Sequence, residues 1–172
     1  MNKNLIIIGA GVYGLVAKEI AESMGCFEKV AFVDDNAVKA PDGAEVIGTV
    51  SDMELLAVDY YNVVVAIGNP EVRLHLIRKL EEISCGVVSL ISPRSYIATS
   101  ARIGKGCIVE PMAVIHSGCV VCDGCIVSSG AVVNHCSVLC DGTHVDCNAT
   151  VAGNAFVPWG TKVYSGEVFK GG

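Results

Sequence analysis

The chain has 172 residues with a formal net charge of −6, and 52% of them are hydrophobic while only 17% are charged. This acidic balance argues against a nucleic-acid-binding surface, which needs clustered Lys and Arg, and no apolar run reaches the roughly 18–20 residues of a membrane-spanning helix. The nine cysteines, an odd number, fit a reducing compartment better than a secreted disulfide framework, so we expect a cytoplasmic protein without a membrane span.

The first half of the chain alternates short apolar runs with amphipathic stretches, which predict strands and helices respectively. The expected strands are residues 5–8, 30–33, 63–67 and 87–91, and the expected helices are residues 15–24 and 70–82. Strands that alternate with helices predict a parallel sheet, so we assign residues 1–92 to a Rossmann-like α/β domain.

A repeat of six residues begins at Ile97. In the twelve hexads that follow, the first position is always aliphatic and the fifth is small in eleven. Such a repeat is typical of a solenoid with triangular coils of three hexads each, in which aliphatic side chains fill the interior and glycines serve the corners. We therefore assign residues 93–172 to a parallel β-helix of about four coils.

A glycine-rich loop follows the first expected strand. Gly9, Gly11 and Gly14 form a G-x-G-x-x-G pattern that opens a helix, where backbone N–H groups can bind a phosphate. Asp34 and Asp35 end the next strand, and a carboxylate there can accept hydrogen bonds from ribose or sugar hydroxyls. Taken alone, the pattern suggests NAD; the alternative is a glycine turn needed only to pack the strand against the helix.

Gly68 and Asn69 end the third expected strand, on the side where open α/β sheets bind ligands. Asn69 either hydrogen-bonds a base or sugar or simply starts the helix at Pro70, and we weigh the two equally. His75 falls within that helix, where a surface or packing role is the better interpretation.

Cys119, Cys122 and Cys125 have a spacing that also occurs in metal and iron–sulfur sites. The hexad register argues against a metal, because Cys119 and Cys125 occupy the small fifth position in the interior of the coil. We therefore expect no metal cofactor.

Stretches spread over nearly the whole chain resemble one family, that of the sialic acid O-acetyltransferases and pilin-glycosylation N-acetyltransferases. They are residues 6–11, 32–35, 46–48, 66–69 with Arg73, 90–93 and 129–153. The resemblance implies that the β-helix is left-handed, that the Rossmann-like domain binds a UDP-sugar or presents a sugar acceptor, and that a homotrimer binds acetyl-CoA between its subunits. It also replaces NAD by a nucleotide sugar as the expected ligand of the glycine loop.

The resemblance further implies which residues bind the acceptor. We expect this of Gly9, Gly11, Tyr13, Gly14, Asp34, Asp35, Gly68 and Asn69. Tyr13 stands where members often have His, and Ser92 replaces a common His before Pro93. The acceptor is therefore expected to be a nucleotide-linked amino sugar or a sialic-acid-like sugar, with N- and O-acetylation both open.

Residues 129–136 resemble the segment that carries the family's catalytic histidine, which is His135 in this chain. A neutral imidazole suits the removal of a proton from the acceptor as it attacks the thioester. By the same resemblance, His144 and Gly153 bind acetyl-CoA. His116 has no further support as a base.

The residue after His135 departs from the family pattern, because Cys136 stands where members usually have an acidic residue. That acidic residue orients and polarises the imidazole in the family. Here the base is either weaker or held by another group, for which the candidates are Asn134, Asp141 and a carboxylate from the first domain.

Family members commonly continue for one or two coils beyond the point that corresponds to Gly172. Those coils help to hold the pantetheine and adenine ends of acetyl-CoA. We therefore expect an acetyltransferase with fewer donor contacts or, as the alternative, a catalytically impaired trimeric protein that binds sugar nucleotides.

Overall fold

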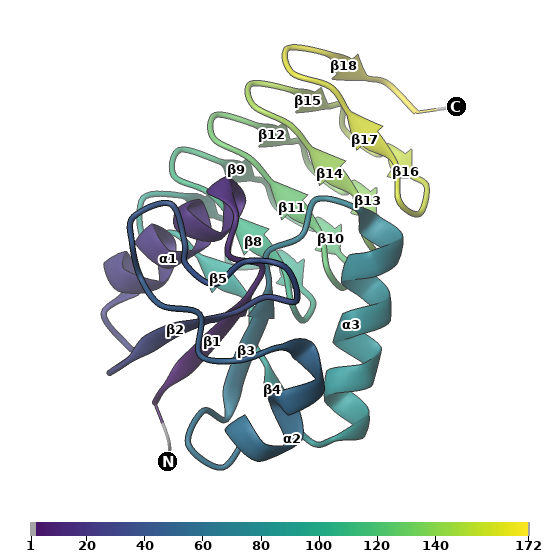
Figure 1. The fold of residues 1–172 in the computed structure, drawn as a ribbon. Helices are drawn as coiled ribbons and strands as arrows, with labels where there is room; N and C mark the ends of the chain where they lie inside the picture. Colours follow the sequence, from purple (N-terminus) through teal and green to yellow (C-terminus); the bar gives the residue numbers. More distant parts are fainter. Residues whose placement is uncertain (1–2, 172) are drawn as a thin grey trace. The chain divides into compact units, whose positions relative to one another are not determined.

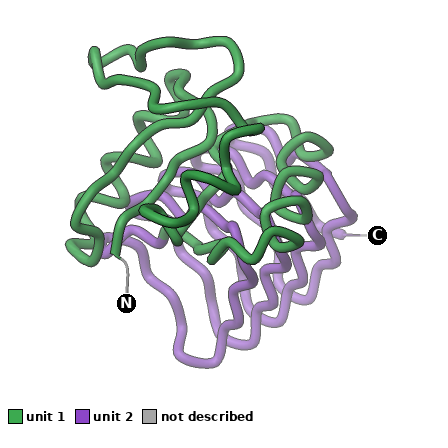
Figure 2. Tube along the Cα trace, turned by 60° about the horizontal axis from the view of Figure 1, so that its bottom comes forward, with its two compact units in different colours: residues 1–90 green, residues 91–172 purple. Residues whose placement is uncertain are grey.

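The computed structural model describes residues 3–171, which form two compact units that meet between Leu90 and Ile91 (Figures 1 and 2). The first unit is an α/β domain and the second is a left-handed parallel β-helix, so the predicted fold class is confirmed. No helix among the described residues is long and apolar enough to cross a membrane.

The first unit contains a parallel sheet with the strand order β2-β1-β3-β4. Its elements are β1 (Leu5–Ile8), α1 (Val12–Met24), β2 (Val30–Val33), the 3-10 helix η1 (Val50–Asp52), α2 (Met53–Leu56), β3 (Asn62–Val65), α3 (Pro70–Glu82) and β4 (Gly86–Val87). All four residues of the central strand β1 are buried, as its continuous apolar sequence predicts. Ile6 and Ile8 share a core cluster with Leu74, Ile77 and Leu80 of α3, which fixes that helix to the sheet.

One predicted strand is wrong. The apolar run at residues 87–91 is not a single strand, because β4 (Gly86–Val87) pairs with β3 while the separate strand β5 (Leu90–Ile91) pairs with a strand of the β-helix. The run contains no Gly or Pro to mark the turn, so hydrophobic periodicity could not reveal the break. The β-helix consequently starts one hexad before Ile97.

The β-helix is built from strands of two residues that stack in three parallel sheets, and we call their outer surfaces faces 1, 2 and 3. Face 1 consists of β5 (Leu90–Ile91), β8 (Ile108–Val109), β11 (Ile126–Val127), β14 (His144–Val145) and β17 (Lys162–Val163). Face 2 consists of β6 (Tyr96–Ile97), β9 (Val114–Ile115), β12 (Val132–Val133), β15 (Thr150–Val151) and β18 (Val168–Phe169). Face 3 consists of β7 (Arg102–Ile103), β10 (Val120–Val121), β13 (Val138–Leu139) and β16 (Phe156–Val157). Val121 pairs with Leu139 and Leu139 with Val157, so each coil takes eighteen residues, or three hexads.

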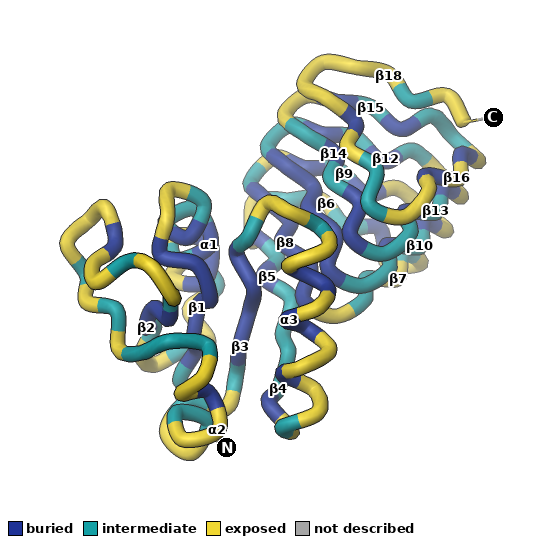
Figure 3. The backbone as a smooth tube through the Cα atoms, turned by 45° about the vertical axis from the view of Figure 1, so that its right-hand side comes forward, coloured by how far each residue is buried: buried dark blue, intermediate teal, exposed yellow. Residues whose placement is uncertain are grey.

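The interior of the coils is filled as the hexad register predicts (Figure 3). First-position side chains such as Val121 and Val133 are buried, and so are the fifth-position side chains of Cys107, Cys119 and Cys125. A hydrogen bond with Cys107, together with burial, raises the pKa of Cys125, so this thiol stays neutral. The buried cysteines therefore act as small apolar side chains.

The corners of the coils depend on the fourth position of the hexad, where the backbone takes a positive φ in eleven of the twelve hexads. This holds at Gly106, Met112, Gly118, Gly124, Gly130, Cys136, Gly142, Asn148, Asn154, Gly160 and Gly166. Glycine and asparagine tolerate this left-handed conformation best, which explains why they dominate the position. From the sequence we expected the corner glycines at positions two to four of the hexad. Within the twelve hexads of the structure, the positive φ is confined to position four.

Candidate functional site

The glycine loop lies at the carboxyl end of β1, and its three glycines serve different purposes. Gly9 has φ of 109°, and a Cβ there would come within 2.9 Å of the Ala66 carbonyl oxygen. A Cβ on Gly14 would overlap the carbonyl oxygen of Gly9, whereas a Cβ on Gly11 would meet nothing within 4 Å. Packing therefore requires Gly9 and Gly14, and exposed Gly11 leaves open space in front of the loop.

Asp34 ties this loop to the end of β2. One carboxylate oxygen accepts a hydrogen bond from the Ala10 N–H at 2.8 Å, and the other accepts from the N–H groups of Asn36 and Ala37 at 2.8 and 2.9 Å. Although burial opposes ionisation, these N–H groups hold the pKa of Asp34 below its usual value. The carboxylate is thus an ionised structural link between β1 and β2.

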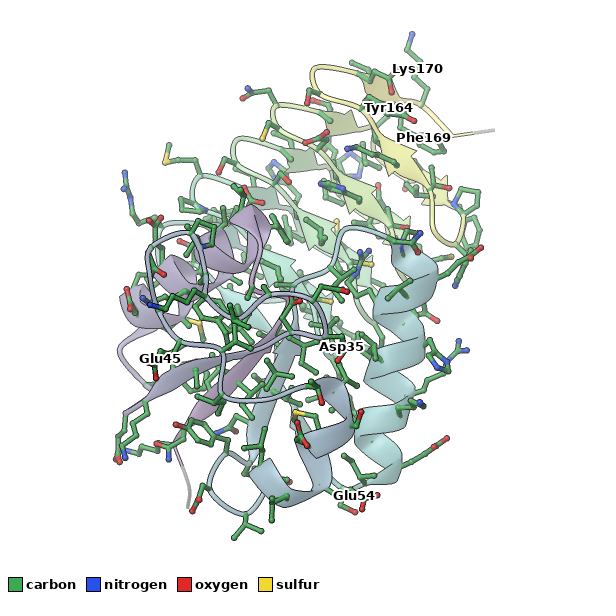
Figure 4. All side chains as sticks on the ribbon, viewed as in Figure 1. Asp35, Glu45, Glu54, Tyr164, Phe169 and Lys170 are labelled. Atoms are coloured by element: carbon green, nitrogen blue, oxygen red, sulfur yellow. The ribbon has the colours of Figure 1, made fainter. Side chains whose placement is uncertain are left out.

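Asp35, labelled in Figure 4, is exposed and lines a cavity of about 530 Å³. Its Oδ1 accepts a hydrogen bond from the Val50 N–H at 2.8 Å. The same cavity is lined by Met53 of α2 and by His75 and Lys79 of α3, all within the first unit. This cavity could not be predicted from the sequence, because residues of two separate helices, α2 and α3, line it together.

Gly68 and Asn69 follow β3, and Asn69 caps α3. Its Oδ1 accepts a hydrogen bond from the Val72 N–H at 3.0 Å, and Pro70 takes the first helical position. Asn69 therefore acts as the N-cap of α3, which is the helix-start role expected as one of its two interpretations. Fully buried Arg73 donates to the Ile67 and Gly68 carbonyl oxygens at 2.6 and 2.9 Å, which holds this loop in place.

The eight residues predicted to bind the acceptor lie in or directly after the loops at the carboxyl ends of β1, β2 and β3. Among them Gly11, Asp35, Gly68 and Asn69 are exposed, while Tyr13 in the first turn of α1 is half-buried. This edge is where open α/β sheets bind ligands. The structure thus brings the predicted acceptor residues together on one edge of the sheet.

His135 lies in the corner between β12 and β13, where its ring is exposed and packs on Gly153 of the next coil. A Cβ on Gly153 would come within 2.7 Å of His135 Cε1 and 2.8 Å of Nε2. Within residues 3–171 no side chain hydrogen-bonds the ring. The contact explains why a residue without a side chain stands at position 153.

Two of the substitutes considered for the family's acidic residue, Asn134 and Asp141, do not reach the His135 ring. Asn134 Oδ1 accepts the backbone N–H of His135 at 2.8 Å, and Asp141 Oδ1 accepts the N–H of Asp123 at 3.0 Å in a different corner. The Asn134 bond is local, and the Asp141 bond joins two successive coils. The expectation that Asn134 or Asp141 orients the imidazole is therefore wrong for the single chain.

His144 is the first residue of β14 and points outward from face 1. Its Nε2 lies 3.1 Å from Ser128 Oγ and 3.8 Å from Asp146 Oδ1. Asp146 Oδ2 also binds Lys162 Nζ at 3.0 Å, and the ring of Tyr164, labelled in Figure 4, lies 5.5 Å from that ammonium group. Burial by itself would raise the pKa of Asp146, but Lys162 and the Cys147 N–H hold this pKa below its usual value.

His135 and His144 do not converge within one chain. His135 follows face 2 in the corner that leads to face 3, and His144 lies on face 1, the side of the triangle opposite that corner. His135 and Gly153 are together, whereas His144 is separate from both. Within residues 3–171 no group of side chains is arranged to hold a metal ion.

Comparison with known proteins identifies the family. Residues 4–80 match the PglD N-terminal domain, and residues 100–135 match the bacterial transferase hexapeptide (six repeats). The acetyltransferase domain of PglB from Neisseria gonorrhoeae FA1090, solved in complex with acetyl coenzyme A, is 30% identical over 98% of this chain and 82% of that chain, with a TM-score of 0.93. The chain belongs to the hexapeptide-repeat sugar acetyltransferases.

Further solved structures share the fold of this acetyltransferase. A second structure of the same PglB domain is 26% identical over 99% of this chain and 92% of that chain, with a TM-score of 0.78. PerB from Caulobacter crescentus, in complex with CoA and GDP-perosamine, is 22% identical over 97% of this chain and 91% of that chain, with a TM-score of 0.66. The comparison with curated proteins found no match. The resemblance read from the sequence is confirmed at the level of the family and the enzyme class.

Proposed function

We propose that this acetyltransferase moves an acetyl group from acetyl-CoA to a nucleotide-linked amino sugar, with O-acetylation of a sialic-acid-like sugar as the closest variant. The observation that carries the proposal is the similarity, over 98% of the chain, to a PglB domain that was solved with acetyl coenzyme A. Such a reaction serves the synthesis of surface glycans or glycoproteins.

His135 is the proposed general base. Its exposed imidazole takes a proton from the acceptor amine as the nitrogen attacks the thioester carbonyl, the C–S bond breaks and CoA leaves. Gly153 supports this role because its lack of a side chain lets the His135 ring lie against the next coil. We assign His144 and Gly153 to the binding of acetyl-CoA.

The acceptor is proposed to bind at the carboxyl edge of the sheet in the first unit. Gly11 offers open space next to the N-terminus of α1, where backbone N–H groups suit a diphosphate. Asp35 and Asn69 are exposed on the neighbouring loops. PerB was solved with GDP-perosamine, and here we propose a UDP-sugar on the basis of the resemblance.

A homotrimer is proposed to complete the donor site. Because His135 and His144 lie on different sides of the β-helix, a site that uses both needs a second copy of the chain. Faces 2 and 3 carry large exposed apolar side chains that suit such contacts, including Tyr96, Phe156 and Val168. We place the reaction in the cytoplasm, which agrees with nine free thiols.

The alternative of a sugar-nucleotide-binding protein without catalysis finds no support in the comparisons, because the solved relatives are acetyltransferases. A nicotinamide-dependent enzyme likewise has no support beyond the glycine loop. Acetyl transfer is therefore the function to test.

The test is release of CoA from acetyl-CoA by the purified protein with a panel of UDP-amino sugars and sialic acids. His135→Ala should lower kcat by roughly 100-fold or more, the usual contribution of a general base. His116→Ala is the matched control, because His116 is an exposed histidine in the corner one coil earlier. No CoA release by the wild-type protein, or equal activity of His135→Ala and His116→Ala, would contradict the proposal.

A further inference from the structure

Three polar side chains, those of Ser128, Asp146 and Lys162, lie around His144, which occupies the outward position of β14. His144 Nε2 faces Ser128 Oγ of the coil before at 3.1 Å and Asp146 Oδ1 of its own coil at 3.8 Å. Asp146 in turn binds Lys162 of the next coil at 3.0 Å. The hydroxyl, imidazole, carboxylate and ammonium groups thus form one row across three coils.

The backbone around this row is fixed on both sides. His144 pairs with Ile126 and with Lys162 in the sheet of face 1, and the Ser128 N–H donates to the Val145 carbonyl at 2.9 Å. Ser128 is only 3% exposed, so its hydroxyl has little alternative to a partner within the protein. The row is therefore a built arrangement and not a chance contact between mobile surface side chains.

The charges in the row decide which ring nitrogen carries the proton. Asp146 lies on the Nε2 side of the ring, and a nearby carboxylate favours an N–H on the nitrogen that faces it. Nε2–H can then donate to Ser128 Oγ, which leaves Nδ1 with the lone pair. Lys162 binds the second oxygen of Asp146.

We propose that Ser128, supported by the Asp146–Lys162 pair, is a positioning residue that holds His144 in one orientation and in the Nε2–H tautomer for its contact with acetyl-CoA. The inference rests on the proposed function for the contact with acetyl-CoA. The tautomer itself is a property of the free protein and can be measured separately.

The first test measures the ring nitrogen chemical shifts of His144 by NMR in the protein without ligand, near neutral pH. The wild-type protein should show the Nε2–H tautomer, and Ser128→Ala and Asp146→Asn should each shift the population toward Nδ1–H. Ser100→Ala is the matched control, because Ser100 Oγ also bridges two coils, by accepting the Gly118 N–H at 3.1 Å far from His144. Wild-type shifts in Ser128→Ala would overturn the inference, whether or not the protein transfers acetyl groups.

The second test is kinetic. Ser128→Ala should raise the KM for acetyl-CoA by about tenfold, the worth of one well-placed hydrogen bond, while the KM for the acceptor stays unchanged. In a His144→Ala background the same substitution should leave the Kd for acetyl-CoA, measured by calorimetric titration, unchanged, because Ser128 acts only through His144. If the two substitutions instead multiply their effects, Ser128 has a merely structural role and the inference fails.

Discussion

At the residue scale, the feature that matters most is the contact between His135 and Gly153. The imidazole has no hydrogen-bonding side chain within the described residues, so its orientation depends on packing against the next coil. Cys136, at the family's acidic position, has a positive φ, and its Sγ lies 3.2 Å from where a Cβ on Gly118 would stand. The thiol thus lies along the corner toward the preceding coil and does not replace the missing carboxylate.

Gly153→Ala is expected to lower kcat while the protein stays folded. The new Cβ would come within 2.7 Å of His135 Cε1, so the ring must move, and a displacement of about 1 Å can cost up to about 100-fold in rate. Because His135 is exposed, the ring can turn toward solvent and the melting temperature should stay close to that of the wild type. An unchanged kcat, or a protein that no longer folds, would contradict this explanation of Gly153.

At the scale of the element, the positive φ at the corners of the coils affects the stability of the β-helix. Eleven successive fourth positions have positive φ, and the non-glycine residues among them include Asn148 and Asn154. A Cβ on Gly166 would meet nothing within 4 Å, although its φ is 73°. Gly166 therefore isolates the backbone cost of the corner from any effect of packing.

Gly166→Ala should lower the free energy of unfolding by about 1–2 kcal/mol, the cost of the left-handed conformation for a residue with a Cβ. Gly166→Asn should lower it less, because asparagine tolerates that conformation and already occupies it in two neighbouring corners. Denaturant unfolding of the three proteins checks both values. If both variants lose the same free energy of unfolding, the positive φ does not explain why glycine and asparagine occupy position four.

The elements also show what the sequence can predict. The interior residues of the β-helix follow from the hexad, because each first-position side chain has only the inside of the coil to enter. The break between β4 and β5 and the hydrogen bond that the Ala10 N–H donates to Asp34 could not be predicted, because both depend on how strands meet in three dimensions. The register pairs His144 with Ile126, two residues before Ser128, so only the side-chain conformations bring Ser128 and His144 into contact.

At the scale of the whole molecule, a donor site that uses both His135 and His144 requires more than one chain. His135 and His144 are separated by the width of the β-helix, and the exposed apolar side chains on faces 2 and 3 are suited to contacts with further copies. In the proposed cyclic trimer, each donor site would take one histidine from each of two neighbouring subunits. Two inactive variants should then complement each other.

The most direct test is the activity of mixed trimers, made by co-expressing His135→Ala and His144→Ala chains with different affinity tags and purifying on both tags. Each variant alone should be nearly inactive, whereas each trimer that carries both tags should have one intact site of its three, or about a third of the wild-type activity, since a site is intact when one neighbour keeps His135 and the other keeps His144. Mixed trimers that stay as inactive as either variant alone would contradict a donor site shared between copies of this acetyltransferase.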